Sequence, residues 1–168
     1  MKSVGRNGLT LIEVLAGFAI LLIAIVGVLM AFLSQSVLNE HSRNFSWAVN
    51  DASRVMEQLQ QQNGAGTCLA VNTAPPVGFA SWDAWLGNAA GGGGKSVPPD
   101  PATNELVVVT APAGADPVEV TVAICWRHRG RVIGECQWDG AQLVPADLDG
   151  NGIITSPVRL STLVTCRK

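Results

Sequence analysis

The sequence predicts an α+β protein in which one long N-terminal helix precedes an antiparallel β-sheet. Three observations support this fold class. Residues 14–39 carry no charge and no proline, residues 34–62 contain neither proline nor glycine, and the C-terminal half holds several short β-branched stretches. With 168 residues, of which 48% are hydrophobic and 14% charged, the chain fits one folded domain plus an anchor. This composition excludes a disordered protein.

The first segment of the predicted helix, residues 9–33, is apolar enough to cross a membrane. At about 1.5 Å rise per residue it spans a hydrocarbon core of roughly 30 Å. Glu13 is the exception within this apolar tract. An ionised side chain at membrane depth costs on the order of a few kcal/mol, so Glu13 requires a partner or a function.

A short basic leader, residues 1–8, precedes this tract and carries Lys2 and Arg6. A leader that ends in Gly8 and is followed by Leu9-Thr10-Leu11-Ile12-Glu13 resembles the class III signal of type IV prepilins and of type II secretion pseudopilins. The resemblance implies that a membrane peptidase cuts between Gly8 and Leu9, methylates Leu9 and leaves the apolar helix in place. The alternative is a single-pass anchor with a chance acid near its cytoplasmic end.

Residues 34–63 are predicted to continue the helix with one apolar and one polar face. Asn63-Gly64 supplies the stop, because glycine tolerates the left-handed conformation that ends helices. The stripe covers too few heptads for a coiled coil. The apolar stripe comprises Leu38, Phe45, Ala48, Val49, Ala52, Val55, Met56 and Leu59. The opposite face, expected in solvent, carries Asn39, Glu40, Arg43, Asn50, Asp51, Arg54 and Gln58.

Residues 64–104 are predicted to be rich in loops. Ser81 is placed to cap a short helix over residues 82–86, with Trp82 and Trp85 packed on the core. Residues 91–94 are four glycines followed by Lys95-Ser96, but no strand precedes them and prolines prevent a helix from following. A phosphate-binding loop needs that helix, so we expect a flexible surface loop instead.

Three strands are predicted over residues 106–110, 118–126 and 158–166, and residues 118–126 alternate cleanly between apolar and polar side chains. A meander of at least three antiparallel strands, docked on the amphipathic helix, is a sufficient core. This arrangement resembles the pilin fold, and the strand ending in Cys125-Trp126 is most similar to minor pilins of the type IV pilus modification protein (PilV) type. Residues 64–168 are then a periplasmic globular domain.

The four cysteines allow three pairings. If Gly130-Arg131 is a two-residue turn, Arg129 faces Val132, and stepping outward places Cys125 opposite Cys136 within disulfide reach. Cys68 and Cys166 then form the second pair; the other pairings remain open. Disulfides fit an oxidising compartment. Metal binding through these cysteines is not expected, because no CxxC motif exists and His41 and His128 lack supporting ligands.

Asp147, Asp149 and Asn151 stand at the first, third and fifth positions of a calcium-loop pattern, with Gly152 at the sixth. The twelfth position should offer a glutamate, but Val158 stands there, and no flanking helices are evident. The alternative is a polar turn, for which this composition is well suited. Calcium is the only cofactor that the sequence suggests.

No catalytic constellation is evident, so we do not expect an enzyme. The net charge of −2, without a basic run, gives no basis for binding nucleic acid. The resemblance implies a minor pilin, held in a bacterial inner membrane with its domain in the periplasm and then incorporated into a pilus. Its implied partners are the prepilin peptidase, the assembly machinery, lipid and other pilins, contacted through the N-terminal helices. The alternatives are a pseudopilin of a type II secretion system and a membrane-tethered calcium-dependent binding module.

Overall fold

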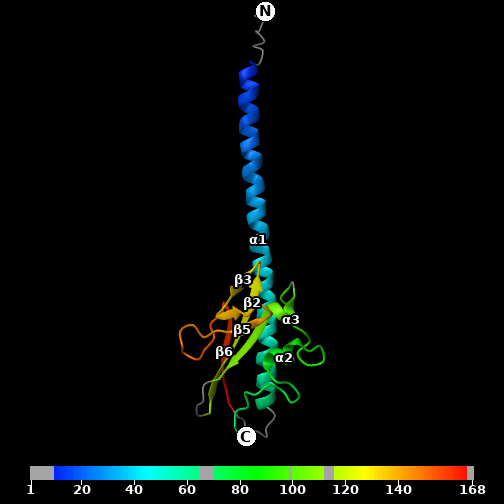
Figure 1. The fold of residues 1–168 in the computed structure, drawn as a ribbon, viewed down its shortest axis with the longest axis vertical. Helices are drawn as coiled ribbons and strands as arrows, with labels where there is room; N and C mark the ends of the chain where they lie inside the picture. Colours follow the sequence, from blue (N-terminus) through cyan, green and yellow to red (C-terminus); the bar gives the residue numbers. More distant parts are fainter. Residues whose placement is uncertain (1–9, 65–69, 99, 112–115, 166–168) are drawn as a thin grey trace, which may run out of the picture. The chain divides into compact units, whose positions relative to one another are not determined.

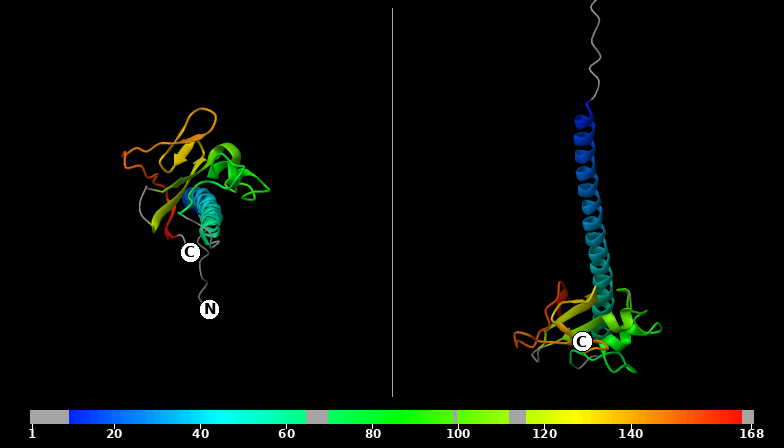
Figure 2. Two further views of the ribbon diagram at one scale, coloured as in Figure 1. Left: turned by 90° about the horizontal axis from the view of Figure 1, so that it is seen from below. Right: turned by 45° about the horizontal axis from the view of Figure 1, so that its top comes forward.

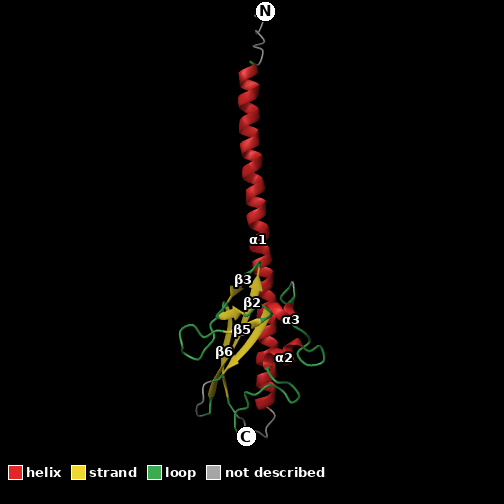
Figure 3. Cartoon of the chain, in the orientation of Figure 1, coloured by secondary structure: helices red, strands yellow, loops and turns green. Residues whose placement is uncertain are grey.

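The structure is a computed structural model that describes residues 10–64, 70–98, 100–111 and 116–165. Helices and strands follow one another in the order drawn in Figures 1 and 3. The elements are α1 (Leu11–Gly64), α2 (Trp82–Gly87), α3 (Pro101–Asn104), β1 (Glu105–Thr110), β2 (Val118–His128), β3 (Arg131–Ile133), β4 (Cys136–Trp138), β5 (Leu143–Pro145) and β6 (Val158–Val164).

The chain divides into two units, Met1–Ser42 and Arg43–Lys168. In the first unit the described residues are helical from Leu11 onward, and the carbonyl of Thr10 accepts hydrogen bonds from the N–H groups of Glu13 and Val14. Side chains from residue 11 to residue 33 are exposed. By length and composition, α1 is long and apolar enough to cross a membrane.

In the second unit, α1 buries one stripe of side chains and ends at Gly64, as predicted. The predicted stripe is partly wrong: Leu38 remains 67% exposed and Phe45 38% exposed. The buried side chains recur at intervals of three and four residues, which keeps them on one face. They are Asn44, Ala48, Asp51, Ala52, Val55, Met56, Leu59 and Asn63.

Strand β2 is the centre of an antiparallel four-stranded sheet, which confirms the α+β class. β1 pairs with it along one side, from Glu105 opposite Trp126 to Thr110 opposite Thr121. Two strands share the other side: β6 lies opposite Val118–Ile124, and β3 lies opposite Trp126–His128. The three predicted strands are confirmed; the last ends at Val164. Strands β4 and β5 form a separate two-stranded sheet that was not predicted.

Both faces of β2 are buried, although the sequence predicted a single apolar face. Val122 and Trp126 pack in the cluster that includes the buried stripe of α1. Ala123 and Cys125, on the alternate face, pack with Leu143 of β5 in a second cluster. The small sheet β4–β5 therefore covers a face of β2 that would otherwise contact water. Figure 2 shows the strands and α1 from two further directions.

Helix α2 forms as predicted. The Ser81 hydroxyl accepts a hydrogen bond of 3.0 Å from the N–H of Ala84, which caps the first turn. Trp82 and Trp85 are both buried, with their ring centroids 5.6 Å apart in an edge-to-face arrangement. Helix α3 lies within a segment expected to be loop. It is a single turn that begins at Pro101, a residue suited to the first helical position.

Candidate functional site

Glu13 lies in the first turn of α1 and is exposed. It is the only charged residue between Leu9 and Asn39. No other side chain of this segment carries a charge that could neutralise it. The proposed cleavage residues Gly8 and Leu9 lie outside the described residues.

The disulfide between Cys125 and Cys136 is present, with Cα atoms 6.2 Å apart. The pairing is confirmed, but the hairpin register used to predict it is wrong. The turn is Arg129-Gly130, with φ angles of 49° and 79°, so Arg127 faces Val132. Positive φ at both central residues is the turn type that best matches strand twist, whereas we expected glycine in the first position.

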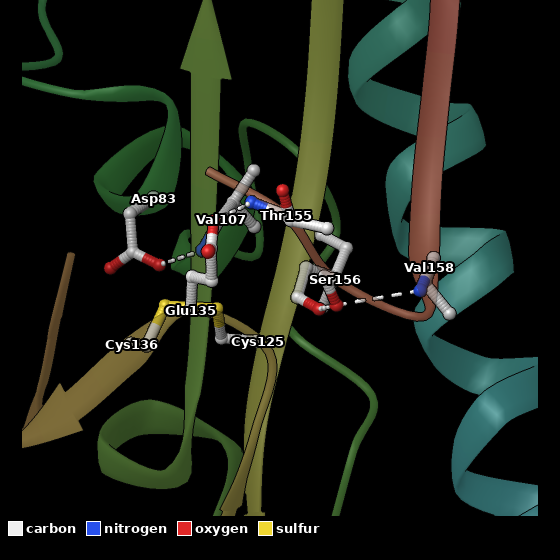
Figure 4. The surroundings of a disulfide bond; sticks show 9 residues. Asp83, Val107, Cys125, Glu135, Cys136, Thr155, Ser156 and Val158 are labelled. Carbon is white, nitrogen blue, oxygen red and sulfur yellow. Dashed lines mark hydrogen bonds between the residues drawn. A yellow bond between two sulfur atoms is a disulfide. The ribbon is translucent and has the colours of Figure 1, made fainter. Parts of the chain in front are cut away.

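Gly134 explains how Cys136 still reaches Cys125. Its φ is +100°, and a Cβ there would lie 2.8 Å from the Cys125 sulfur. Only glycine fits this close approach, and the chain turns here from β3 into β4. Figure 4 shows Glu135 beside the bridge, where its carboxylate accepts a 2.7 Å hydrogen bond from Thr155 N–H. Cys68 and Cys166 lie outside the described residues, and their pairing stays a prediction.

Polar side chains gather between α1 and β1, and we call Asp51, Arg54, Ser96 and Glu105 the carboxyl cluster. Asp51 and Glu105 are buried, and Arg54 and Ser96 are half-buried. Asp51 is fully buried, which corrects its predicted place on the solvent face. Its carboxylate accepts hydrogen bonds of 2.7 Å from Ser96 N–H and 2.9 Å from the Ser96 hydroxyl, and it forms an ion pair with Arg54. Glu105 is 1% exposed and accepts a 3.0 Å hydrogen bond from Val97 N–H.

The pKa of the Glu105 carboxyl is strongly raised. Burial is the largest influence, followed by a hydrogen bond to Asp51 and by repulsion from that carboxylate, and together they raise the pKa of Glu105 to about 8. With a pKa of about 8, Glu105 is mostly protonated at neutral pH. Its Oε1 is buried and makes no hydrogen bond within the described part of the chain.

Arg54, also expected in solvent, anchors the glycine-rich residues 91–94. Its guanidinium donates to the carbonyls of Gly92 and Gly94, the latter at 2.7 Å. Gly92 lies so close to α2 that a Cβ there would meet Leu86 Cα at 2.5 Å. We expected a flexible surface loop, but this loop is tightly packed. Its carbonyl groups accept hydrogen bonds from the Arg54 guanidinium, whereas a phosphate-binding loop would present its N–H groups to a phosphate.

Lys95 is held along the outer edge of β1. Its ammonium lies 2.8 Å from the Asp83 carboxylate and donates a 2.6 Å hydrogen bond to the carbonyl of Glu105. Asp83 in turn accepts a 3.0 Å bond from Val107 N–H. A lysine and an aspartate thus satisfy backbone groups that no neighbouring strand reaches in the described part of the chain.

The candidate calcium residues form a turn closed by their own carboxylates. Asp147 accepts hydrogen bonds of 2.9 Å from Gly150 N–H and 2.8 Å from Gly152 N–H, and Asp149 accepts one from the Asn151 amide. The bond from Gly152 is the main reason that the pKa of Asp147 is lowered. Among the described residues, no group of three or more His, Cys, Asp or Glu side chains is placed to hold a metal ion.

We expect the melting temperature of the protein to be unchanged by millimolar calcium, because backbone amides already engage the Asp147 carboxylate. Thermal unfolding with added calcium or with chelator measures this. A ligand present at a hundred times its dissociation constant would stabilise by about 2.7 kcal/mol, which a melting curve resolves. A rise in the wild type that is absent in Asp149→Ala would instead establish calcium binding by Asp147, Asp149 and Asn151.

Sequence reasoning missed the carboxyl cluster, although one signal was available. Asn44, Ala48, Asp51 and Val55 are spaced by four, three and four residues, which is the spacing of a single helix face. That spacing places Asp51 within the buried stripe of α1. We had assigned Asp51 to the solvent-exposed face only because its side chain is charged.

No protein-family model matches the chain, and comparison with curated proteins and with solved structures also gave no match.

Proposed function

We propose that this protein is a minor pilin, a structural or priming subunit of a type IV pilus with the pilin fold. The observation that carries the proposal is Glu13, a lone carboxylate near the start of an exposed apolar helix, preceded by a basic leader that ends in Gly8. The α+β domain and its disulfide are compatible with an exported subunit. The proposal includes no enzymatic activity, no nucleic-acid partner and no cofactor.

Glu13 has a physical role in this proposal. Cleavage after Gly8 would create an amino group on Leu9, four residues and about one helical turn away. In a bundle of helices, the Leu9 amine of a neighbouring subunit serves equally well. Attraction between the two charges is strong at low effective dielectric, although desolvation offsets much of it. Such a pair would set the axial register of an incoming subunit.

A pseudopilin of a type II secretion system would have the same leader, helix and Glu13, so genomic neighbours distinguish it from a pilus subunit. A tethered calcium-dependent binding module is a different class of protein. It predicts calcium binding at Asp147, Asp149 and Asn151, and no effect of Glu13 on assembly.

We expect Glu13→Val to accumulate in the membrane at least as well as the parent but to enter pili about tenfold less, a loss equivalent to roughly 1.4 kcal/mol of subunit docking. The measurement is an immunoblot of membrane and sheared-pilus fractions. Glu57→Val, which removes an exposed carboxylate from the same helix, is the matched control. Mass spectrometry of the membrane fraction should find methylated Leu9 as the first residue. Equal recovery of Glu13→Val and the parent in pili would contradict the proposed role.

A further inference from the structure

The turn over residues 147–152 contains two dipeptides that are prone to spontaneous covalent change, Asp149-Gly150 and Asn151-Gly152. In such a dipeptide the glycine nitrogen can attack the side-chain carbonyl carbon of the preceding residue, because glycine has no Cβ to hinder the approach. All residues of the turn are exposed, so water reaches the reacting groups. The turn is therefore a candidate site of covalent modification.

The reaction at Asn151 needs no reagent other than water. The Gly152 nitrogen loses its proton to solvent and forms a bond to Asn151 Cγ, while the side-chain nitrogen takes up a proton and departs as ammonia. Water then opens the resulting succinimide and leaves either aspartate or isoaspartate. At Asp149 the Gly150 nitrogen attacks in the same way, but water departs instead of ammonia. Neither reaction involves an oxidant or an enzyme.

The carboxylate of Asp147 holds both attacking nitrogens. Its Oδ1 accepts a 2.9 Å hydrogen bond from Gly150 N–H, and its Oδ2 accepts a 2.8 Å hydrogen bond from Gly152 N–H. Each nitrogen must give up this bond before it can turn toward Cγ, which costs free energy. A negative carboxylate also disfavours the amide anion that attacks. One side chain thus opposes both reactions.

A second Asp-Gly dipeptide in the chain lacks this arrangement. Asp139-Gly140 lies in the turn between β4 and β5 and is also exposed. The Asp139 carboxylate accepts hydrogen bonds of 2.8 Å from the N–H groups of Ala141 and Gln142, but Gly140 N–H donates none within the described part of the chain. The two turns therefore differ in whether a carboxylate occupies the glycine nitrogen.

From these contacts we propose that Asp147 is a positioning residue that protects Asp149 and Asn151 from succinimide formation. This gives the first carboxylate of the turn a role that needs no metal ion. The protection concerns the chemical durability of an exposed turn, so it does not depend on membrane anchoring or on assembly into a filament.

The test follows covalent change in the full chain, kept folded in detergent with a chelator at mildly alkaline pH. Residues 132–159 form one tryptic peptide that contains all three dipeptides, so mass spectrometry compares them in the same molecules. Deamidation of Asn151 changes the mass, and enzymatic methylation of isoaspartate detects the change at Asp139 and Asp149.

We expect Asn151 in the folded chain to react about tenfold more slowly than in the free tryptic peptide, equivalent to about 1.4 kcal/mol for release of the amide. Isoaspartate should accumulate faster at Asp139 than at Asp149. Asp147→Ala should bring the rate at Asn151 close to that of the free peptide. Asp147→Asn, which keeps an acceptor oxygen without the charge, should give an intermediate rate.

Asp139→Ala is the matched control, since it removes an exposed carboxylate that also accepts two backbone hydrogen bonds. The rate at Asn151 in this variant should equal that of the parent. An unchanged rate in Asp147→Ala would overturn the proposal, and a slower one would show that the carboxylate acts as a base that promotes the attack. Equal rates at Asn151 in the folded parent and in its free peptide would overturn the protection without any variant.

Discussion

Replacing Asp51 with alanine should lower the free energy of unfolding of the folded domain by about 3 kcal/mol. The substitution leaves Ser96 N–H and the Arg54 guanidinium without their carboxylate, while both donors stay in place. Leaving a buried donor or charge unsatisfied costs more than the pair gains when it forms. Urea unfolding followed by tryptophan fluorescence measures the loss, because all five tryptophans lie between residues 47 and 138.

The matched control is Glu57→Ala, which removes an exposed carboxylate from the same helix and should change stability by no more than about 0.5 kcal/mol. Asp51→Asn should fall between the two, because an amide keeps an oxygen for Ser96 but loses the charge that Arg54 pairs with. A loss below about 1 kcal/mol for Asp51→Ala would show that the carboxyl cluster is not a stabilising contact between α1 and β1.

Stability should also fall as the pH rises from about 5 to 8, because of Glu105. In the folded protein the pKa of this carboxyl is raised to about 8 from an ordinary value of 4.5, chiefly by burial. Between these values the folded state holds a proton that the unfolded state has released. The free energy of unfolding therefore decreases with pH, by up to about 1.4 kcal/mol per pH unit, and this contribution is lost above pH 8.

Glu105→Gln is the variant that isolates this effect, since an uncharged amide imitates the protonated acid. We expect the variant to match the parent near pH 5 and to exceed its stability at pH 8.5 by on the order of a few kcal/mol. Both proteins keep His41 and His128, so the difference between their pH profiles reports Glu105. Parallel profiles for the two proteins would contradict the raised pKa.

The elements that were predicted correctly are those encoded by local signals. Ser81 caps α2 through a bond to an amide three residues away, and the alternation of residues 118–126 defines the faces of β2. Helix α1 was predicted because residues 14–39 contain no proline and residues 34–62 contain neither proline nor glycine. Each of these signals is complete within a short stretch of chain, so it is legible without the tertiary structure.

The features that were missed depend on partners far apart in the sequence. Asp51 is buried because Ser96, 45 residues later, supplies its hydrogen bonds. The hairpin register depends on Arg129 adopting a positive φ, which is unusual for a residue other than glycine. The disulfide was nevertheless placed correctly, because a bend at Gly134 compensates for the error in register.

The position of Lys95 beside β1 has a consequence for solubility. In the described part of the chain β1 pairs only with β2, so its other edge is a place where a strand of another molecule could add. Lys95 already occupies the carbonyl of Glu105, and Asp83 occupies the N–H of Val107. A second chain would have to displace both side chains and separate their charges before its own backbone could pair. The two residues that hydrogen-bond this edge of β1 thus oppose edge-to-edge aggregation of the protein.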